Sequence, residues 1–333
     1  MTANGFGVPG GDGTLEARLR AGMQAVERGL AAAVSSEAEF VNEAARHLLD
    51  AGGKRFRPLL VLLAAEFGRP DTDADAVISA ALVVELTHVA TLYHDDVMDE
   101  ARLRRGAPSA NARFDNSVAI LTGDFLFAQA SDIVADLGPE AVHIQARTFA
   151  RLVQGQIAET RGPGARDNPL QHYLSVVADQ TGSLIAASAH LGALTAGCDE
   201  GQQRLLTEFG ERIGTAFQLS DDILDVAGDA ADSGKTPGTD LREGVPTLPV
   251  LLFQRSADTA DDPLRALLAG DLTDDDRLAD ALRLLRAHPA MAEARSYVSD
   301  RAAEARELLD GLPAGPPRDA LGDLCDLVVT RTV

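Results

Sequence analysis

Apolar residues recur every three or four positions along most of this chain, which is the spacing of one face of an α-helix. Strand-like alternation bounded by hairpin turns is scarce. The pattern therefore predicts an all-α protein. It places helices over about 14–33, 37–51, 58–67, 73–99, 116–136, 139–159, 171–197 and 200–226, with further helices toward the end of the sequence.

The breaks between these helices do not divide the 333 residues into separate domains. No linker rich in Pro, Gly and Ser and no repeat of 20–50 residues stands out. We therefore expect a flexible N-terminal arm over 1–13 and one domain over 14–333. The arm is Gly-rich and lacks the basic and apolar segments of a signal peptide. A stretch rich in Gly, Asp and Pro from Gly228 to Pro249 is predicted to be a long loop, and loops of that length commonly serve as lids.

Charge and cysteine content narrow the classes of function. The formal net charge is −21, from 30 basic and 51 acidic residues, which argues against binding to nucleic acid. Cys198 and Cys325 have no metal-ligand spacing and are predicted to be reduced core residues of a cytoplasmic protein. No uninterrupted apolar run reaches 18 residues, so no transmembrane segment is expected.

Two acidic motifs carry the strongest chemical signal. Asp95-Asp96-Val97-Met98-Asp99 and Asp221-Asp222-Ile223-Leu224-Asp225 both read D-D-x-x-D. On a helix, the first and last Asp of each motif share a face. Carboxylates so close repel one another unless a cation lies between them, and oxygen ligands in small number suit Mg²⁺. A single motif could be a solvated acidic helix face, but apolar flanks and duplication favour a cluster of Mg²⁺ ions that grip a diphosphate from both sides.

Basic residues lie near both acidic motifs. The turn Gly52–Pro58 holds three cations beside two glycines, Arg102–Gly106 follows the first motif, and Lys235 follows the second. Each could be structural, as a solvated helix terminus or an ion-pair network. Each could also hold phosphate oxygens.

Together these motifs resemble the trans-isoprenyl diphosphate synthases, also called polyprenyl synthetases. Order and spacing agree over about residues 40–250. The matching segments are Gly52–Pro58, His94–Asp99 with Arg104–Gly106, Gln218–Asp225, Gly234–Lys235 and Asp240–Pro249. The resemblance implies a single orthogonal bundle of long helices around a deep central cavity, usually in a homodimer.

The resemblance also implies a role for each matching residue. Three Mg²⁺ ions would bridge the allylic diphosphate, and Asp222 would support their ligands. The implied metal ligands are Asp95, Asp96, Asp99, Asp221 and Asp225. The first three are also expected to be catalytic, together with Arg104 and Lys235, which would neutralise the leaving diphosphate. The diphosphate of isopentenyl diphosphate would be held by Gly53, Lys54, Arg57, His88 and Arg105. Gln180, Thr181 and Gln218 complete the implied substrate site.

The chain departs from the family pattern at Gln180 and Val245. Family members usually have lysine before Thr181, and many have lysine where Val245 stands. Glutamine can donate a hydrogen bond but brings no positive charge to the diphosphate.

The expected reaction is Mg²⁺-dependent condensation of an allylic prenyl diphosphate with successive isopentenyl diphosphates. The residues before the first acidic motif are small, so the cavity floor looks open and we expect products longer than C20. A length of C30–C50, for a quinone side chain, is favoured, with transient membrane contact during product release. The residues that would set the length are Ala90, Thr91, Thr87 and Val84, unless Phe125 or Phe127 on another helix forms the floor.

Three alternatives remain at this point. The first is a synthase of short C15–C20 products, such as farnesyl or geranylgeranyl diphosphate. The second is a class I terpene cyclase, which needs no second substrate site and normally lacks a second D-D-x-x-D. The third is a non-catalytic partner subunit that regulates a prenyl synthase. Such partners tend to lose an acidic motif, and both motifs are whole here.

Overall fold

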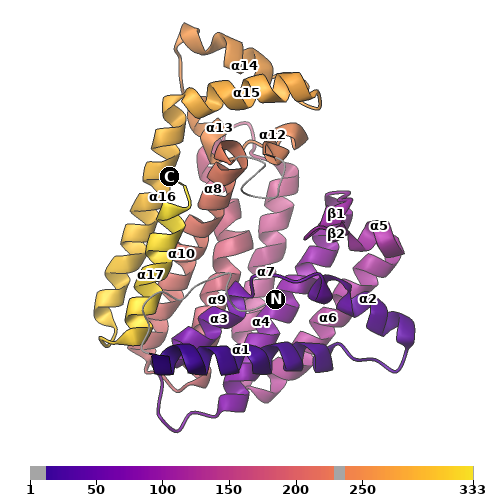
Figure 1. The fold of residues 1–333 in the computed structure, drawn as a ribbon, viewed down its shortest axis with the longest axis vertical. Helices are drawn as coiled ribbons and strands as arrows, with labels where there is room; N and C mark the ends of the chain where they lie inside the picture. The colour runs from indigo at the N-terminus through magenta and orange to yellow at the C-terminus, as the bar shows by residue number, and fades with distance from the viewer. Residues whose placement is uncertain (1–12, 229–236, 333) are drawn as a thin grey trace. The chain divides into compact units, whose positions relative to one another are not determined.

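The computed structural model describes residues 13–228 and 237–332, which are predominantly helical (Figure 1). The predicted N-terminal arm lies outside the described residues, apart from Gly13. The described residues form two compact units. The first contains the residues up to Ala150, Leu184–Gly210 and Leu309–Leu321; the second contains Arg151–Ser183, the residues described within Glu211–Leu308, and those from Gly322 onward. The unit boundaries fall within helices, so several long helices contribute residues to both units.

The helices and strands follow the predicted order closely. The chain begins with α1 (Gly13–Ala33), α2 (Glu39–Asp50), α3 (Phe56–Ala65), α4 (Ala74–Met98), β1 (Leu103–Arg104), β2 (Ala107–Pro108), α5 (Ala110–Phe114), α6 (Asn116–Asp136), α7 (Pro139–Arg161) and α8 (Pro169–Val177). It continues with the π-helical turn η1 (Ala178–Gly182), α9 (Ser183–Thr195), α10 (Glu200–Ala227), α12 (Thr239–Glu243), α13 (Leu248–Phe253), the 3₁₀ turn η2 (Thr259–Asp261), α14 (Asp262–Leu268), α15 (Asp275–Ala287), α16 (Pro289–Leu308), the 3₁₀ turn η3 (Leu309–Gly311) and α17 (Pro316–Thr330).

In the first unit, α4 is the central helix. It packs most extensively against α6 and also contacts α3 and α1. Asp73 caps its start, where the side chain accepts a hydrogen bond from the backbone N–H of Asp75 at 3.0 Å, as expected for an N-cap. The buried residues of α4 are mostly apolar and are not confined to one face, which is typical of a helix inside a core.

Two helices of the described chain are long and apolar enough to cross a membrane by composition alone. In its most apolar 18-residue window, α4 is 67% buried inside the protein, so α4 is a core helix. The corresponding window of α6 is only 33% buried. One face of α6 is therefore apolar and is left uncovered by the residues that the structure describes.

In the second unit, α13 packs against α16, α8 and α15. The structure corrects the predicted loop from Gly228 to Pro249, because α12 and the start of α13 lie within it. Gly238 and Gly244 flank α12 with φ angles of 77° and 75°. Their left-handed backbone favours glycine, and the high content of turn-forming residues concealed the short helix from the sequence pattern.

Two further local features differ from the prediction. The helix predicted over 171–197 is interrupted by η1, where the backbone accommodates one extra residue per turn. The residues after α4 form an antiparallel hairpin in which Leu103 pairs with Pro108 and Arg104 with Ala107. A hairpin of two-residue strands gives no alternating pattern long enough to detect.

Candidate active site

The first acidic motif lies at the C-terminal end of α4. Asp99 is the C-cap residue, and its backbone N–H donates to the carbonyl oxygen of Asp95 at 2.8 Å. The predicted i, i+4 relation of these two residues is therefore confirmed. The Asp99 side chain is 55% exposed, whereas Asp96 is completely buried. The three carboxylates of one motif thus occupy different environments.

Asp96 is held by groups that lie beyond α4 in the sequence. Nε of Arg104, in the β1–β2 hairpin, donates to its Oδ1 at 2.6 Å, and the backbone N–H of Ala110 donates to its Oδ2 at 3.1 Å. Arg104 also approaches Asp99 at 3.7 Å. A buried carboxylate needs such partners. Because both oxygens of Asp96 are engaged, this residue orients the motif and anchors Arg104 to it.

The predicted basic residues of the first unit gather around one point. Arg105 donates to the carbonyl oxygens of Leu48 and Gly52, at 3.0 Å for Leu48, which fixes the hairpin to the turn after α2. A Cβ atom on Gly53 would lie 3.0 Å from the Arg105 guanidinium, so only glycine leaves this space open. His88 on α4 lies within the electrostatic influence of Arg57 and Arg105. Four of the residues expected to hold one diphosphate, namely Gly53, Arg57, His88 and Arg105, therefore lie near one another.

Arg57, His88 and Arg105 lie close enough together for the arginine charges to act on the other members of the group. Burial, opposed by Glu85 but reinforced by Arg105, lowers the pKa of Arg57 to about 10. Burial and the neighbouring arginines lower the pKa of His88 well below its usual value, so its imidazole is neutral. Nε of Arg57 is buried and has no hydrogen-bond partner among the described residues. Such a cluster favours an anion with several oxygens.

Arg55 differs from its neighbours in the same turn. It is buried and pairs with Glu85 at 3.0 Å and Glu27 at 2.8 Å. It also donates to the carbonyl oxygen of Leu49. These contacts occupy its guanidinium, so the turn contains one structural cation beside the two predicted binding residues, Lys54 and Arg57.

The second acidic motif, on α10, repeats the arrangement of the first. Asp222 is buried, like Asp96; it accepts hydrogen bonds from the hydroxyl of Tyr173 and from Nε2 of Gln218, the latter at 2.9 Å. Burial raises the pKa of Asp222 to about 6, although these hydrogen bonds oppose the rise. Among the described residues, Asp222 has no arginine partner comparable to Arg104, so no cation opposes the effect of burial on its pKa.

The two outer carboxylates of the second motif contact later segments of the chain. Asp225 accepts hydrogen bonds from the backbone N–H groups of Thr239 and Asp240, both at 3.1 Å. Asp221 accepts one from Arg331, which follows α17. Lys235 lies outside the described residues. Arg331 was not predicted, because no motif marks it and 110 residues separate it from Asp221.

Comparison with known proteins places these motifs in a family. The family model described as polyprenyl synthetase matches residues 38–285. This chain belongs to the polyprenyl synthetase family. It is a prenyltransferase, a trans-polyprenyl diphosphate synthase, with the all-α isoprenoid synthase fold. The predictions of fold class, family and type of enzyme are thus confirmed.

Three relatives illustrate the similarity. The chain is 50% identical to the nonaprenyl diphosphate synthase of Mycobacterium tuberculosis, over 98% of this chain and 97% of that protein. A geranylgeranyl pyrophosphate synthase from Corynebacterium glutamicum, complexed with calcium and isoprenyl diphosphate, superposes with a TM-score of 0.87 at 44% identity, covering 97% and 98% of the two chains. A decaprenyl diphosphate synthase from Rhodobacter capsulatus superposes with a TM-score of 0.86 at 35% identity, covering 96% and 99%.

The donor set of this polyprenyl synthetase fits Mg²⁺. Each acidic motif provides two outer carboxylates one helical turn apart, and Mg²⁺ is commonly bound by one or two carboxylates plus waters and substrate phosphates. Within 13–228 and 237–332, no three His, Cys, Asp or Glu side chains form a group that could hold a metal ion by themselves. A metal ion at either motif would therefore take further ligands from water or from a bound phosphate.

Gln180 lies in the π-helical turn η1, which is a common device for presenting functional side chains. Its amide donates to Gln156 at 2.8 Å and to Glu159 at 2.7 Å, both on α7. The hydroxyl of Thr181 donates to Gln218 at 3.1 Å. Because Gln218 donates in turn to Asp222, η1 is connected by hydrogen bonds to the second acidic motif.

The residues predicted to set product length lie along α4 below the first motif. Val84, Thr87 and Ala90 are buried, and Thr91 is partly exposed. The Thr87 hydroxyl is buried without a hydrogen-bond partner in the described chain. The effect of these small side chains on product length stays a prediction.

The helix α6 packs directly across from this part of α4. A Cβ atom on Gly123 would lie 3.1 Å from the Ala90 carbonyl oxygen and 2.4 Å from the His94 ring. Phe127 stacks between His94 and Phe149, with ring centroids 5.8 Å and 4.3 Å away. The alternative floor residue Phe127 is therefore part of an aromatic cluster beside the upper part of α4.

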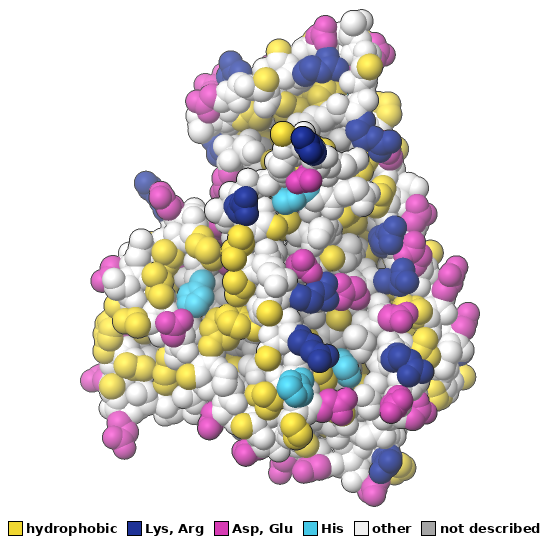
Figure 2. All heavy atoms as spheres, turned by 180° about the vertical axis from the view of Figure 1, so that it is seen from behind, with side chains coloured by type: hydrophobic (Ala, Val, Ile, Leu, Met, Phe, Trp, Pro, Cys, Tyr) yellow, Lys and Arg dark blue, Asp and Glu magenta, His cyan; other side chains and the backbone are white. Residues whose placement is uncertain are grey.

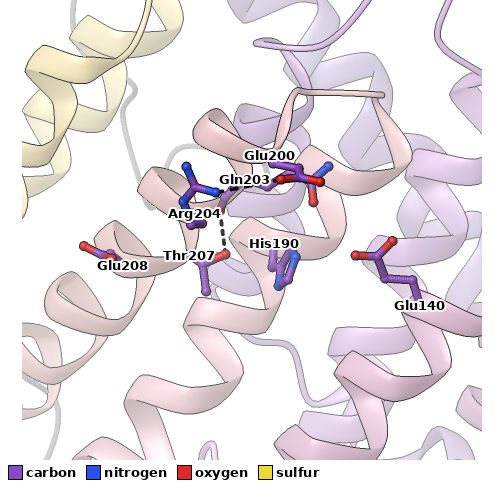
Figure 3. Close-up of a pocket in the computed structure, with 7 residues that line it drawn as sticks. All are labelled: Glu140, His190, Glu200, Gln203, Arg204, Thr207 and Glu208. Atoms are coloured by element: carbon purple, nitrogen blue, oxygen red, sulfur yellow. Dashed lines mark hydrogen bonds and ion pairs between the residues drawn. The ribbon is translucent and has the colours of Figure 1, made fainter.

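The first unit also has a cavity of about 420 Å³ lined by residues of α7, α9 and α10. Figure 3 shows Glu140 across from His190, with Glu208 directed away from both. The acidic side chains do not converge on one point, and no residue predicted from the sequence lines this cavity.

Proposed function

We propose that this enzyme condenses an allylic prenyl diphosphate with successive isopentenyl diphosphates in a Mg²⁺-dependent reaction. The observation that carries the proposal is the duplicated motif, in which a buried central Asp orients two outer carboxylates. The nearby anion-binding cluster of Arg57, His88 and Arg105 provides a separate site for a second diphosphate. A condensing enzyme needs sites for two diphosphates, whereas a cyclase needs a site for only one.

The outer carboxylates would hold the metal ions, three in all. We assign this role to Asp95, Asp99, Asp221 and Asp225. Asp96 was expected from the sequence to be a fifth ligand, but we propose for it a supporting role like that of Asp222, because both of its carboxylate oxygens accept hydrogen bonds within the protein. When bound, Mg²⁺ supplies positive charge to the allylic diphosphate as its C–O bond breaks. Arg104, held in place by Asp96, donates to the departing oxygens, and so would Lys235.

The second substrate would bind through its diphosphate to the basic cluster. Arg57 and Arg105 would donate to the phosphate oxygens, with Gly53 and Lys54 at the rim and neutral His88 between them. This arrangement keeps the double bond of isopentenyl diphosphate free to attack the allylic carbon. The apolar residues of α4 and its neighbours exclude the water that would otherwise quench the cation.

Product length is the finer part of the proposal. Val84, Thr87, Ala90 and Thr91 are small, so a growing chain can extend along α4 past these positions, and each residue adds about 1.5 Å of depth. We propose products longer than C20, in the range C30–C50, for a quinone side chain. The relatives named as nonaprenyl and decaprenyl synthases support this length, and the relative named as a geranylgeranyl pyrophosphate synthase supports the short-chain alternative.

Chromatography of the products made by the purified enzyme tests these proposals together. The enzyme alone should incorporate labelled isopentenyl diphosphate with Mg²⁺ but not with EDTA, and the products should exceed C20. Products that stop at C15 or C20 would establish the short-chain alternative. Incorporation only after addition of another subunit would establish a regulatory or heteromeric role.

We also propose that a second copy of the chain covers the apolar face of α6 and α7. Ile120 and Leu121 on α6 are 42% and 66% exposed, and Phe149 and Ile157 on α7 are 36% and 54% exposed. Hydrophobic side chains gather at the lower left of Figure 2, which is turned by 180° and so corresponds to the lower right of Figure 1, where α6 is labelled. An exposed apolar face of this kind is typical of subunit interfaces.

Light scattering during size-exclusion chromatography tests the dimer. Leu121→Asp should convert a homodimer into a monomer, whereas Val245→Asp, at another exposed apolar residue, should not. A wild-type monomer would refute the proposal. We further propose that the enzyme acts in the cytoplasm without a transmembrane segment and contacts the membrane transiently to release product. Flotation with lipid vesicles, with and without product, measures that contact.

A further inference from the structure

Arg331 binds the second acidic motif although neither the sequence motifs nor the proposed mechanism uses it. Its Nη2 donates to Oδ1 of Asp221. The guanidinium carbon lies 4.7 Å from the ring centroid of Phe217, one helical turn before Asp221. The Arg331 side chain is 19% exposed and that of Asp221 is 38% exposed. The Arg331 side chain is therefore paired with Asp221, a carboxylate that we assign to a metal ion.

The position of Arg331 is fixed by the surrounding structure. Nε of Arg295 on α16 donates to the carbonyl oxygen of Thr332 at 2.7 Å. Thr332 is buried, and its hydroxyl donates to the carbonyl oxygen of Val329 at 2.8 Å. These contacts hold the backbone on either side of the arginine, so the pairing with Asp221 belongs to the fold of the second unit.

Another nitrogen of the Arg331 guanidinium lacks a hydrogen-bond acceptor. Nη1 of Arg331 is buried and has no hydrogen-bond partner among the described residues. Guanidinium groups bind phosphate oxygens through two parallel N–H donors. Nη1 of Arg331 is an unpartnered donor beside a motif that we assign to a metal–diphosphate complex. It is therefore placed to donate a hydrogen bond to an oxygen of that diphosphate.

We propose that Arg331 is a further diphosphate-binding residue, held against Asp221 until Mg²⁺ and the allylic diphosphate arrive. Mg²⁺ and Arg331 compete for Asp221, and Arg331 then donates to the diphosphate that accompanies the metal. The guanidinium of Arg331 also brings positive charge to the diphosphate, which the neutral side chain of Gln180 does not. This inference rests on the proposed function, because it requires a diphosphate at the second motif.

Calorimetry with Mg²⁺ alone and with Mg²⁺ plus inorganic pyrophosphate separates the two parts of the proposal. In Arg331→Gln, the affinity for Mg²⁺ alone should rise by about fivefold, because a competing ion pair is lost. The affinity for pyrophosphate in the presence of Mg²⁺ should fall by at least about tenfold, because a charge-assisted hydrogen bond is lost. Pyrophosphate binding in EDTA, which reports on the basic cluster, should not change.

Arg255→Gln is the matched control. Arg255 pairs with Glu293 at 2.9 Å on the surface of the same unit, so this variant loses the same charge and a similar ion pair without touching the motif. It should leave every affinity unchanged. Arg331→Lys, which keeps the charge but not the forked donors, should recover part of the binding of pyrophosphate with Mg²⁺, and it serves as the test if Arg331→Gln does not fold.

Equal affinities in wild type and Arg331→Gln would overturn the inference while leaving the proposed function intact. Tighter Mg²⁺ binding without weaker pyrophosphate binding would also overturn it, because Arg331 would then be a counter-ion only. Failure of the wild type to bind pyrophosphate with Mg²⁺ at all would instead defeat the proposed function itself.

Discussion

Replacing each central aspartate by asparagine probes how its buried carboxylate is held. In Asp96→Asn, the Arg104 guanidinium loses the carboxylate that it contacts at 2.6 Å. Breaking one side of a buried ion pair costs about 3–5 kcal/mol. Arg104 is 28% exposed and also approaches Asp99 at 3.7 Å, so water and Asp99 offset part of the loss. We therefore expect a free energy of unfolding lower by about 3 kcal/mol.

In Asp222→Asn, the same chemical change should cost less than about 1 kcal/mol at pH 7.5. The pKa of Asp222 is raised to about 6 by burial, so its ionised form is disfavoured in the folded state. A carboxyl group whose folded pKa lies above its unfolded pKa stabilises the protein below the unfolded value and loses that contribution as pH rises through 6. Asp222→Asn should therefore gain stability relative to wild type as pH rises from about 4 to about 6, and the difference should stay level above that range.

Urea unfolding in EDTA measures both variants, with Asp95→Asn as the control. Asp95 is an outer carboxylate, so its substitution should leave stability nearly unchanged and reduce turnover by orders of magnitude. Equal destabilisation by Asp96→Asn and Asp222→Asn, or no destabilisation by Asp96→Asn, would refute the assigned difference between the two central carboxylates.

Three further outcomes are expected. Gln180→Lys should raise kcat/KM for the allylic substrate by less than about tenfold, because the new lysine can pair with Glu159, which Gln180 contacts at 2.7 Å; a larger gain in steady-state assays would mean that the site lacks charge. Thr91→Phe should shorten the products seen by chromatography, and an unchanged distribution would place the cavity floor elsewhere. Burial raises the pKa of Cys198 and of Cys325 to about 11, so iodoacetamide at pH 8 should label them slowly until urea unfolds the protein, whereas rapid labelling of the native enzyme would contradict their burial.

Much of this enzyme follows from local sequence rules. The long apolar helices, the i, i+4 pairing of Asp95 with Asp99 and the glycine turn at Gly52 depend on periodicity and backbone geometry over a few residues. These features are visible without any knowledge of the fold. The same rules predicted a loop over the segment that contains α12, because a five-residue helix between two glycines has too few periodic positions to register.

The tertiary structure determines which role each of several residues of the same type has. Asp95 and Asp96 are adjacent and chemically equal, yet only the packing of the β1–β2 hairpin buries Asp96 against Arg104. Likewise, Arg55 and Arg57 lie in one turn, but the partners of Arg55 come from α1 and α4. Arg331 meets Asp221 across 110 residues. Such assignments depend on contacts between segments far apart in the chain, and helical periodicity contains no information about which distant partner a side chain will meet.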